Sequence, residues 1–281
     1  MLVVRKVRDQ LLSRRRLEQS GFTPSRSTVD RIITLNTLIQ TRKEFQRPLW
    51  IAFVDLKAAF DSVYRKALWC LFRSYGLDNK VVDLMEALYT DTCSCVNVDG
   101  VMSDCFAVDS GVRQGCRIAP DLFLGPMDYV MERTVHRGMT GVTLEHEIFT
   151  DLDFADDVAL LAEMLEVLVL ALTVMHEEAA AFGLQINWSK TKIIQFGNPA
   201  PCPTVQVADG LVEVVDSFVY LGSMIDSSGG SRGEILRRIG LARTCMQQLE
   251  KRIWKSGIRL DTKICLYQTY IVPVVLYGCE T

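Results

Sequence analysis

The sequence predicts an α+β fold, and three observations support this prediction. The 281 residues have an ordinary globular composition, 49% hydrophobic and 23% charged, which indicates one large domain or two smaller ones. Short apolar runs typical of buried strands occur beside longer amphipathic segments typical of helices. No internal repeat or low-complexity segment stands out, so a repeat architecture is not indicated.

The first elements follow from apolar spacing and flanking residues. Residues 30–41 (DRIITLNTLIQT) have largely helical spacing and follow turn residues at 23–25, so they predict an amphipathic helix. Residues 49–54 (LWIAFV) form a short apolar run after Pro48, which is typical of a strand buried on both faces. Asp55 stands at the end of this strand.

The next segment predicts two helices and a hairpin. The first helix is expected to begin at Asp61 or Ser62, either of which suits an N-cap. The second covers residues 79–89. Two strands joined around Asp99-Gly100 are then predicted, because Asp-Gly is a strong hairpin turn signal.

Residues 149–161 (FTDLDFADDVALL) hold four aspartates enclosed by apolar residues. Two strands are predicted here, over 148–154 and 158–161, and they meet at a turn that contains Asp156 and Asp157. A helix over 163–182 is expected to follow.

The last part of the chain predicts short strands and then a basic helical segment. The strands are expected at 184–186, 192–196 and 218–225. The pattern becomes helical and basic from Ser231 onward, with a composition change near 227–230 that we interpret as a boundary.

Charge is segregated along the chain, although the net charge is only −3. Residues 1–47 carry 11 Lys/Arg against 4 Asp/Glu and residues 231–281 carry 9 against 4, whereas residues 48–230 carry 11 against 26. Basic ends around an acidic centre fit a protein that grips a polyanion and needs cations at its centre. The alternative is that acidic surface residues only keep the middle of the chain soluble.

Cysteine usage and the chain's apolar runs indicate an intracellular protein. Nine cysteines, an odd number, are scattered along the sequence, which fits reduced thiols better than a disulfide framework. The first 16 residues lack the apolar core and cleavage site of a secretory signal. No apolar run approaches the roughly 20 residues of a membrane span. We expect a location in the cytoplasm or nucleus and no membrane attachment.

Three aspartates form the strongest candidate site. If the strands that end at Asp55 and at Asp156-Asp157 are neighbours in one sheet, their carboxylates converge. Divalent cations such as Mg²⁺, which prefer carboxylate oxygens, would relieve the repulsion. Two ions about 3.5–4 Å apart would clamp the attacking and leaving oxygens of an in-line phosphoryl transfer. An isolated Asp-Asp pair is more often a polar turn, and spacing alone leaves that alternative open.

Six sequence blocks occur along the chain in this order: QSGFTPSRSTVD (19–30), FVDLKAAFDSV (53–63), GVRQGCRIAPDLF (111–123), FADD (154–157), GLQINWSKTK (183–192) and FVYLGSMI (218–225). In this order they resemble the reverse transcriptases, in particular those of non-LTR retrotransposons, the long interspersed elements. The resemblance implies an RNA-directed DNA polymerase, a nucleotidyltransferase. Such an enzyme adds deoxynucleoside triphosphates to a DNA primer on an RNA template with two Mg²⁺ ions, or Mn²⁺.

Carried over residue by residue, the resemblance makes Asp55, Asp156 and Asp157 the metal-binding catalytic carboxylates. Lys190 matches the lysine that protonates or neutralises the departing pyrophosphate, although an exposed lysine without a role is the alternative. Asp61 stays outside the site, because its position at a helix start favours an N-cap.

Four further residues match the family's nucleotide pocket. Arg26 is expected near the triphosphate, which suits a guanidinium fork. Phe60 matches the aromatic residue beside the sugar, where its ring would exclude a 2′-hydroxyl. Gln114 and Gly115 match the pair that lines the pocket, with Gly115 allowing close backbone approach. The alternatives are a surface arginine at 26 and ordinary core packing at 60.

The resemblance also implies a right-hand polymerase fold, with an antiparallel sheet backed by helices in its palm. Leu221 and Gly222 match the primer-grip turn. The chain divides into partial fingers (1–50), a palm (51–229) with an inserted fingers portion at about 70–113, and the start of a thumb or connection (230–281). Members of the family usually extend beyond both ends, so we expect a fragment.

Some positions depart from the family pattern. Thr23 stands where a basic residue is common, Arg117 and Asp121 occupy usually apolar positions, and Asp151 and Asp153 add negative charge beside the catalytic turn. None of these removes a catalytic group.

Two alternatives to an active polymerase stay open. One is an inactive, truncated polymerase remnant that only binds nucleic acid, and the other is a chain without a stable fold.

Overall fold

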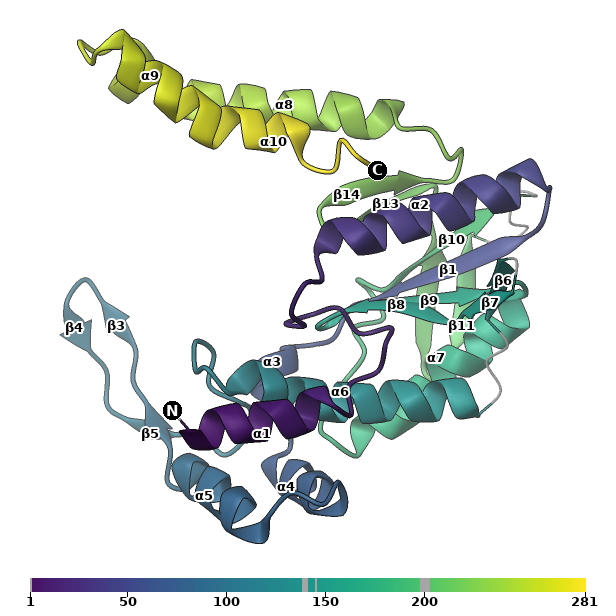
Figure 1. The fold of residues 1–281 in the computed structure, drawn as a ribbon, viewed down its shortest axis with the longest axis vertical. Helices are drawn as coiled ribbons and strands as arrows, with labels where there is room; N and C mark the ends of the chain where they lie inside the picture. Colours follow the sequence, from purple (N-terminus) through teal and green to yellow (C-terminus); the bar gives the residue numbers. More distant parts are fainter. Residues whose placement is uncertain (1, 138–140, 145, 198–202) are drawn as a thin grey trace.

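A six-stranded sheet forms the centre of the protein (Figure 1). The computed structural model describes the whole chain except residues 1, 138–140, 145 and 198–202. The strand order is β11-β12-β10-β1-β9-β8, and neighbours run antiparallel except β10 and β12, which are parallel. The expected α+β fold, with an antiparallel sheet backed by helices, is therefore confirmed apart from that one pair. The strands are β1 (Leu49–Val54), β8 (Asp151–Phe154), β9 (Asp157–Ala162), β10 (Lys192–Phe196), β11 (Thr204–Val207) and β12 (Gly210–Val214).

Strand β1 lies inside the sheet, between β9 and β10. Its side chains alternate between two hydrophobic cores, one on each face of the sheet. Ile51 and Phe53 enter one core, while Ala52 and Val54 enter the other. All six residues are buried, which confirms the predicted strand covered on both faces.

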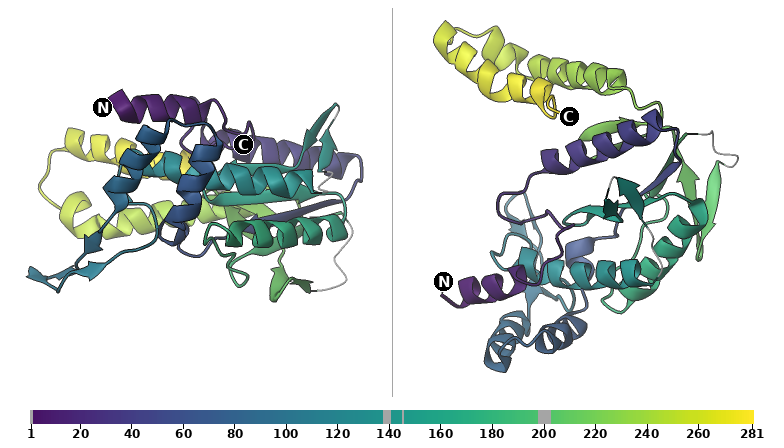
Figure 2. Two further views of the ribbon diagram at one scale, coloured as in Figure 1. Left: turned by 90° about the horizontal axis from the view of Figure 1, so that it is seen from below. Right: turned by 45° about the vertical axis from the view of Figure 1, so that its right-hand side comes forward.

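Helices cover both faces of the sheet, as Figures 1 and 2 show. Helices α6 (Ala119–His136) and α7 (Leu165–Ala180) pack against each other on the face that Val54 enters. Helix α2 (Thr28–Glu44) covers the opposite face. It begins at Ser27, whose hydroxyl accepts from the Asp30 N–H while the Asp30 carboxylate accepts from the Ser27 N–H, a capping box that fixes its start.

Four shorter helices surround this centre. Helix α1 (Leu2–Leu12) lies along α6, and α3 (Ala59–Ser62), α4 (Arg65–Ser74) and α5 (Asn79–Tyr89) follow β1. The helix predicted over 79–89 is confirmed. The N-cap predicted at Asp61 or Ser62 is wrong, because both residues lie within α3. Helix α4 instead begins after Tyr64, which makes no side-chain capping bond.

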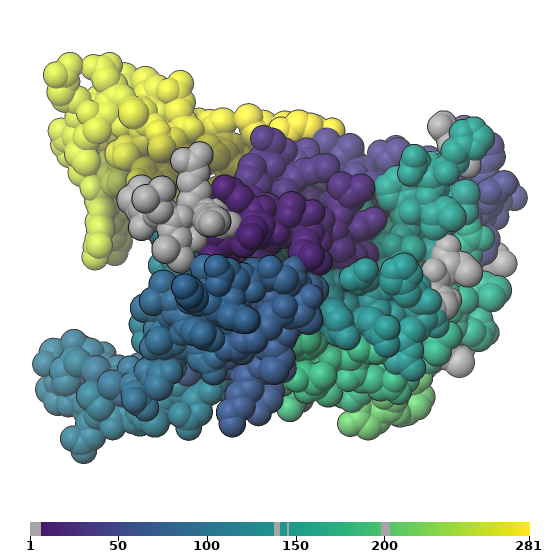
Figure 3. Space-filling view, turned by 60° about the horizontal axis from the view of Figure 1, so that its bottom comes forward, coloured from purple at the N-terminus to yellow at the C-terminus, as the bar shows by residue number. Residues whose placement is uncertain are grey.

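A β-arm of residues 93–107 projects from the body beside α5 (Figures 1 and 3). Strands β2 (Cys93–Ser94) and β5 (Phe106–Ala107) form its base, and β3 (Asn97–Val98) and β4 (Val101–Met102) form its tip. Asp99 and Gly100 both have positive φ, 51° and 87°, as a two-residue hairpin turn requires. The hairpin predicted at this dipeptide is confirmed.

The predicted strand over 148–154 is divided in the structure. Strand β7 (Glu147–Phe149) pairs with β6 (Val142–Leu144) in a separate ribbon, and β8 starts only at Asp151. Strand β8 then pairs with β9 as a hairpin in which Phe154 lies opposite Asp157. Ala155 and Asp156 are the two turn residues. The predicted turn is therefore confirmed for Asp156, whereas Asp157, which was also expected in the turn, is the first residue of β9.

Two predicted strands differ in the structure. The predicted strand over 218–225 is wrong, because it is two strands, β13 (Ser217–Tyr220) and β14 (Ser223–Asp226), joined by a tight turn. The strand predicted at 184–186 is also wrong, since only an isolated bridge between Leu56 and Ile186 forms there.

The C-terminal part is a helical hairpin that extends away from the sheet (Figure 1). The helical part comprises α8 (Arg232–Gln248), the π-helical turn η1 (Glu250–Trp254), α9 (Leu260–Leu266), the π-helical turn η2 (Tyr267–Ile271) and α10 (Val272–Leu276).

Candidate active site

Asp55 and Asp157 lie opposite each other at one end of the sheet. Strands β1 and β9 pair in antiparallel register up to Val54 opposite Val158. The same register continued by one position places Asp55 opposite Asp157. Side chains of facing residues share one face of a sheet and have Cβ atoms about 4.5–5.5 Å apart. The fold thus brings together two carboxylates that are 102 positions apart in the sequence.

Asp156 occupies the tight turn directly before Asp157. The turn has a strained backbone, because Ala155 adopts φ +60°, in the left-handed region that alanine seldom occupies. Asp55 and Asp156 are partly exposed and Asp157 is exposed. Within the described part of the chain, none of these three side chains accepts a hydrogen bond or forms an ion pair.

Burial and neighbouring charges both act on the pKa of Asp157. Partial desolvation, followed by the neighbouring charges of Asp156 and Asp55, raises the pKa of Asp157 to about 6. Carboxylates without a basic partner that still repel one another are a donor set suited to a hard divalent cation. The chemistry of these residues therefore fits the metal that the sequence predicts. Among the described residues, no three acidic, histidine or cysteine side chains are already drawn close enough to enclose an ion.

A pocket of about 370 Å³ opens beside these carboxylates. Asp55, Asp157 and Lys190 line it together, which brings the predicted lysine to the same site as two of the predicted carboxylates. Lys190 is exposed. It comes three residues after Asn187, whose N–H donates to the Asp55 carbonyl at 2.8 Å. The remaining lining comes from β1, β9, β10, the turn before β10 and the strand β13: Phe53, Val54, Val158, Ser189, Lys192, Phe218, Val219 and Tyr220.

The other two aspartates of the central stretch lie on the opposite face. Asp151 and Asp153 are opposite Leu160 and Val158, which belong to the α6–α7 core, whereas Asp157 is on the face that α2 covers. The expectation that they add negative charge beside the catalytic turn is therefore wrong in its geometry. The sheet separates the two pairs of carboxylates.

Arg16 neutralises this second pair. Its guanidinium donates to both carboxylate oxygens of Asp151, at 2.9 and 2.8 Å, and to Asp153 at 3.2 Å. Burial opposes the charged form, but the two carboxylates still raise the pKa of Arg16. Burial and the Asp151 charge raise the pKa of Asp153, whose Oδ1 finds no partner among the described residues. Arg16 is thus the cationic partner of Asp151 and Asp153, whereas the metal ions predicted from the sequence concern Asp55, Asp156 and Asp157.

A related ion-pair cluster holds α1 and its following loop on α6. Arg15 lies 3.4 Å from Asp121 and 3.7 Å from Asp128, and Arg8 lies 3.8 Å from Asp121. Asp121 therefore departs from an apolar pattern because it is an ion-pair partner. Burial raises the pKa of Asp128 to about 7, against the opposing effect of Arg15. Sequence spacing gave no signal for these pairs, since the partners lie more than 100 positions apart.

The segment that contains Gln114 and Gly115 runs beside α3. The Val112 N–H donates to the Phe60 carbonyl at 2.7 Å, which places this segment next to Phe60. Gln114 and Gly115 are exposed in a turn, and Gly115 has φ +84°, a conformation that favours glycine. The Phe60 ring is half-buried and stacks on Phe123 of α6, with centroids 4.5 Å apart.

Arg65 fixes the base of that segment, a role the sequence did not reveal. Its guanidinium makes five hydrogen bonds of 2.8–3.0 Å, all to uncharged acceptors. It also lies over the Tyr89 ring at 5.2 Å, and Arg113 lies over the same ring at 5.5 Å. The acceptors are the carbonyls of Tyr89, Val108, Ser110 and Gly111 and the Thr92 hydroxyl.

Leu221 and Gly222 form the turn between β13 and β14. Both have positive φ, 47° and 80°, as a two-residue hairpin turn of the primed type requires. The C-terminal segment holds this turn: the Tyr277 hydroxyl donates to the Leu221 carbonyl at 2.7 Å, and Arg237 donates to the Gly222 carbonyl at 3.1 Å. Arg238 also bonds the Gly222 carbonyl and lies over the Tyr277 ring at 4.5 Å.

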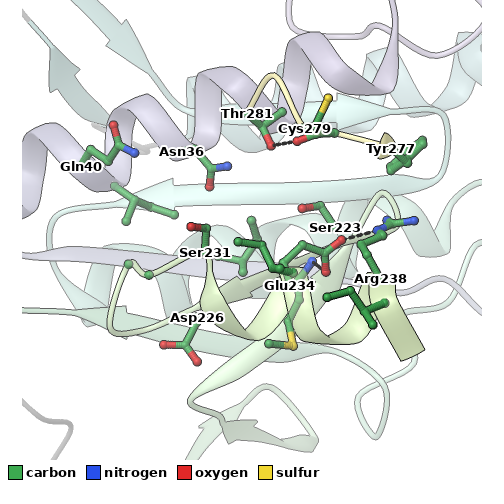
Figure 4. A pocket seen from close by; sticks show the side chains of 18 of the residues that line it. Asn36, Gln40, Ser223, Asp226, Ser231, Glu234, Arg238, Tyr277, Cys279 and Thr281 are labelled. Atoms are coloured by element: carbon green, nitrogen blue, oxygen red, sulfur yellow. Dashed lines mark hydrogen bonds and ion pairs between the residues drawn. The ribbon is translucent and has the colours of Figure 1, made fainter. Parts of the chain in front are cut away.

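A second pocket, of about 420 Å³, lies behind this turn between α2, β14, α8 and the C-terminal residues (Figure 4). Glu234 and Arg238 form an ion pair in its lining.

Arg26 is exposed before α2, and its side chain has no hydrogen bond or ion pair with the described residues. The structure does not bring Arg26 to the carboxylates.

Two further observations concern the cysteines and the helices. Eight cysteines in the described part of the chain are free thiols. Over the same residues, no helix combines the length and the hydropathy that crossing a bilayer requires.

A mainly antiparallel sheet, two backing helices and carboxylates on adjacent strands define the palm of a nucleic-acid polymerase. A family model described as reverse transcriptase (RNA-dependent DNA polymerase) matches residues 2–225. The chain belongs to this family, and the resemblance stated from its sequence blocks is confirmed.

Curated relatives come from retrotransposable elements. The chain is 23% identical over 272 residues to the Pol polyprotein of the type-1 retrotransposable element R2 of Popillia japonica. It is 26% identical over 265 residues to that of the type-2 element R2DM of Drosophila melanogaster. It is 23% identical over 273 residues to the RNA-directed DNA polymerase of the mobile element jockey of Drosophila funebris. The matches cover 91–93% of this chain but only 37%, 24% and 29% of those relatives, so the chain spans well under half of their length.

Solved telomerases share the fold. The structure of telomerase from Candida albicans in complex with a fragment of telomeric RNA matches 99% of this chain and 53% of its own, with a TM-score of 0.56 and 12% identity. Apo telomerase from Candida tropicalis, truncated from its C-terminal domain, matches 80% of this chain and 43% of its own, with a TM-score of 0.53 and 17% identity.

Proposed function

We propose that this chain is the polymerase part of a retrotransposon reverse transcriptase. It would extend the 3′-hydroxyl of a DNA primer with deoxynucleoside triphosphates on an RNA template. The observation that carries the proposal is the Asp55–Asp157 pair, held across two strands beside Asp156 with no ion-pair partner among the described residues. Family membership supports the choice of this reaction over other phosphoryl transfers.

Asp55, Asp156 and Asp157 would hold two Mg²⁺ ions, or Mn²⁺, through their carboxylate oxygens. When bound, the ions supply positive charge to the attacking and leaving oxygens of the phosphoryl transfer. The chain's own contribution is to fix the carboxylates on a rigid sheet. Lys190, in the same pocket, would donate a proton to the departing pyrophosphate or neutralise its charge.

The nucleotide would lie between the carboxylates and the segment around Gln114. We propose that Gln114 and Gly115 contact it through the exposed turn, and that Phe60 excludes a 2′-hydroxyl beside the sugar. The stacking of Phe60 on Phe123 holds the ring in one orientation, which a steric gate needs. Arg26 would reach the triphosphate only when the loop that precedes α2 closes over the site.

We propose the division expected from the resemblance: fingers sequence at 1–50, a palm at 51–229 with a fingers insertion at about 70–113, and a thumb from 230. The turn of Leu221 and Gly222 would support the primer end, since the hairpin β13–β14 covers the same pocket as Asp55. An intracellular location, in the cytoplasm or the nucleus, agrees with the free thiols of the described residues.

Primer extension tests this proposal. The unaltered chain should add labelled deoxynucleotides to a DNA primer on an RNA template with Mg²⁺, and no product should form after chelation. Asp156→Asn should lose at least about 100-fold in rate, because transition-state charge stabilisation is a large catalytic contribution. The control is Asp99→Asn, an equal change at an exposed turn residue of the β-arm. Unchanged extension by Asp156→Asn contradicts the assignment.

A second candidate function is nucleic-acid binding without turnover. The observation in its favour is the basic C-terminal segment, with 9 Lys/Arg against 4 Asp/Glu over residues 231–281. Binding of an RNA–DNA duplex that weakens steeply with salt, together with no incorporation of labelled nucleotide, would support this alternative.

A further inference from the structure

The segment that follows α1 lies along the edge strand of the catalytic hairpin. The Ser20 N–H donates to the Asp153 carbonyl at 2.9 Å, and the Asp153 N–H donates to the Glu18 carbonyl at 3.2 Å. Gln19 thereby forms a parallel bridge with Asp153. Arg31 of α2 holds the segment from its other side, with a bond from its Nε to the Ser20 hydroxyl at 2.6 Å. Residues 18–20 thus extend the sheet beyond β8.

This pairing carries the Gln19 side chain to the turn before the catalytic aspartates. Gln19 Oε1 accepts from the Ala155 N–H at 2.8 Å, and Gln19 Nε2 donates to the Ala155 carbonyl at 3.2 Å. The same Oε1 accepts from the Gly21 N–H at 2.7 Å. Gln19 is only 2% exposed, so water does not compete for these bonds. The side chain therefore holds both the N–H and the C=O of Ala155.

The absence of a side chain at Gly21 makes this contact possible. A Cβ atom at Gly21 would lie 2.2 Å from the Ala155 nitrogen and 2.7 Å from its Cα. Those atoms are backbone, so no side-chain rotation could relieve the overlap. Gln19 and Gly21 together enclose Ala155, the residue with φ +60° that directly precedes Asp156.

We propose that Gln19 is a positioning residue for the polymerase reaction: its amide fixes the left-handed conformation of Ala155 and thereby the directions of the Asp156 and Asp157 carboxylates. The inference rests on the proposed function and extends it. It assigns to residues 18–20, which are remote in sequence from the catalytic turn, a role in holding that turn. Gln19 touches no substrate, so its effect would be exerted through the carboxylates.

Two substitutions distinguish the loss of the Gln19 hydrogen bonds from the effect of a negative charge at this position. Gln19→Glu keeps the acceptor for the two N–H groups but removes the donor to the Ala155 carbonyl. Gln19→Met has similar length and no charge, and it removes all three bonds. The control is Gln206→Glu, because Gln206 also donates to a backbone carbonyl, that of Ala208 at 3.0 Å, but is exposed on β11.

The first readout is Mn²⁺ binding, followed by the electron paramagnetic resonance signal of the free ion, with primer–template and an unreactive nucleotide analogue present. We expect the Mn²⁺ concentration at half-saturation to rise at least about fivefold in both Gln19 variants, because misplaced ligands bind metal more weakly. The second readout is steady-state kinetics, in which kcat should fall by about 10–100-fold while the primer–template Kd stays unchanged. Gln206→Glu should match the unaltered chain in every readout.

A purely structural role gives a different pattern. It would lower the melting temperature of the Gln19 variants but leave Mn²⁺ half-saturation and the kcat per folded molecule unchanged, and that result would overturn the inference. If Gln19→Met does not unfold cooperatively, Gln19→Glu alone decides. Because the Mn²⁺ titration needs no turnover, it also separates the two proposals. Lack of incorporation by the unaltered chain contradicts the proposed function, whereas equal Mn²⁺ affinities of variants and unaltered chain contradict the role of Gln19.

Discussion

Asp55 and Asp157 face each other across two antiparallel strands, one position beyond the last paired residues, Val54 and Val158. No basic side chain in the described part of the protein compensates them, whereas Asp151 and Asp153, on the opposite face of the same hairpin, share Arg16. The hairpin β8–β9 thus carries Asp151 and Asp153, which Arg16 compensates, together with Asp156 and Asp157, which have no ion-pair partner among the described residues. Substitutions at these residues, at Asp128 and at Arg65 test the account.

Asp157→Asn should stabilise the unliganded protein while it abolishes nucleotide addition. The folded-state pKa of Asp157, about 6, lies above its ordinary value of 3.8. The carboxylate therefore lowers stability increasingly as pH rises from about 4 to about 6, and the loss persists above pH 6. At pH 7.5 in a chelator the variant should melt at a higher temperature than the unaltered chain. Added Mg²⁺ should raise the melting temperature of the unaltered chain only, and an equal Mg²⁺ effect on both proteins would contradict the site.

Arg16→Met should strongly destabilise the fold. It leaves Asp151 and Asp153 buried without their partner, and breaking a buried ion pair from one side costs about 3–5 kcal/mol. The matched control is Arg259→Met, which breaks the exposed pair with Asp261 and should cost less than about 1 kcal/mol. Urea unfolding gives both values. Equal losses in the two variants would show that Arg16 does not compensate a buried charge.

Asp128→Asn should flatten the pH dependence of stability. The folded-state pKa of Asp128 is about 7, well above its ordinary 3.8, so the folded state holds this proton more tightly than the unfolded state. Its contribution to stability is greatest below about pH 4 and is lost as pH rises to about 7. The unfolding free energy between pH 5 and pH 8 should fall by roughly 1–3 kcal/mol more in the unaltered chain than in the variant. Parallel pH profiles of the two proteins would refute this assignment.

Arg65→Lys should loosen the segment that carries Gln114 and Gly115. Lysine offers three donors from one nitrogen and cannot reach the five acceptors that the guanidinium fork satisfies. The KM for the nucleotide should rise several-fold, and the Val112 amide should exchange hydrogen faster. An unchanged KM together with faster exchange would separate this segment from nucleotide binding. The control is Lys66→Arg at the neighbouring exposed position, because it also replaces one basic residue by the other.

The sequence predicted those features that depend on local pattern. The apolar run 49–54 marked β1 with its correct ends, and the four aspartates marked the turn at Asp156. Asp-Gly at 99–100 gave the hairpin of the β-arm because only certain residues accept its backbone angles. These signals lie within a few residues of the structure they specify.

Features that depend on distant partners were not predictable in this way. A basic run at residues 14–16 looks like a solvated surface until the fold places Arg16 between Asp151 and Asp153. The local pattern over 218–225 predicted a single strand, which was wrong, because Leu221 is not a strong turn residue; only the family resemblance placed a turn at Leu221 and Gly222. The contact of Gln19 with Ala155 likewise joins positions 136 apart, so spacing alone could not reveal it.

Anomalous diffraction from a crystal of the chain with RNA template, DNA primer, a nucleotide analogue and Mn²⁺ tests the central claim most directly. We expect two Mn²⁺ peaks roughly 3.5–4 Å apart, in contact with the carboxylates of Asp55, Asp156 and Asp157. Mn²⁺ bound at Asp151 and Asp153 instead, or no Mn²⁺ beside Asp55, would contradict it.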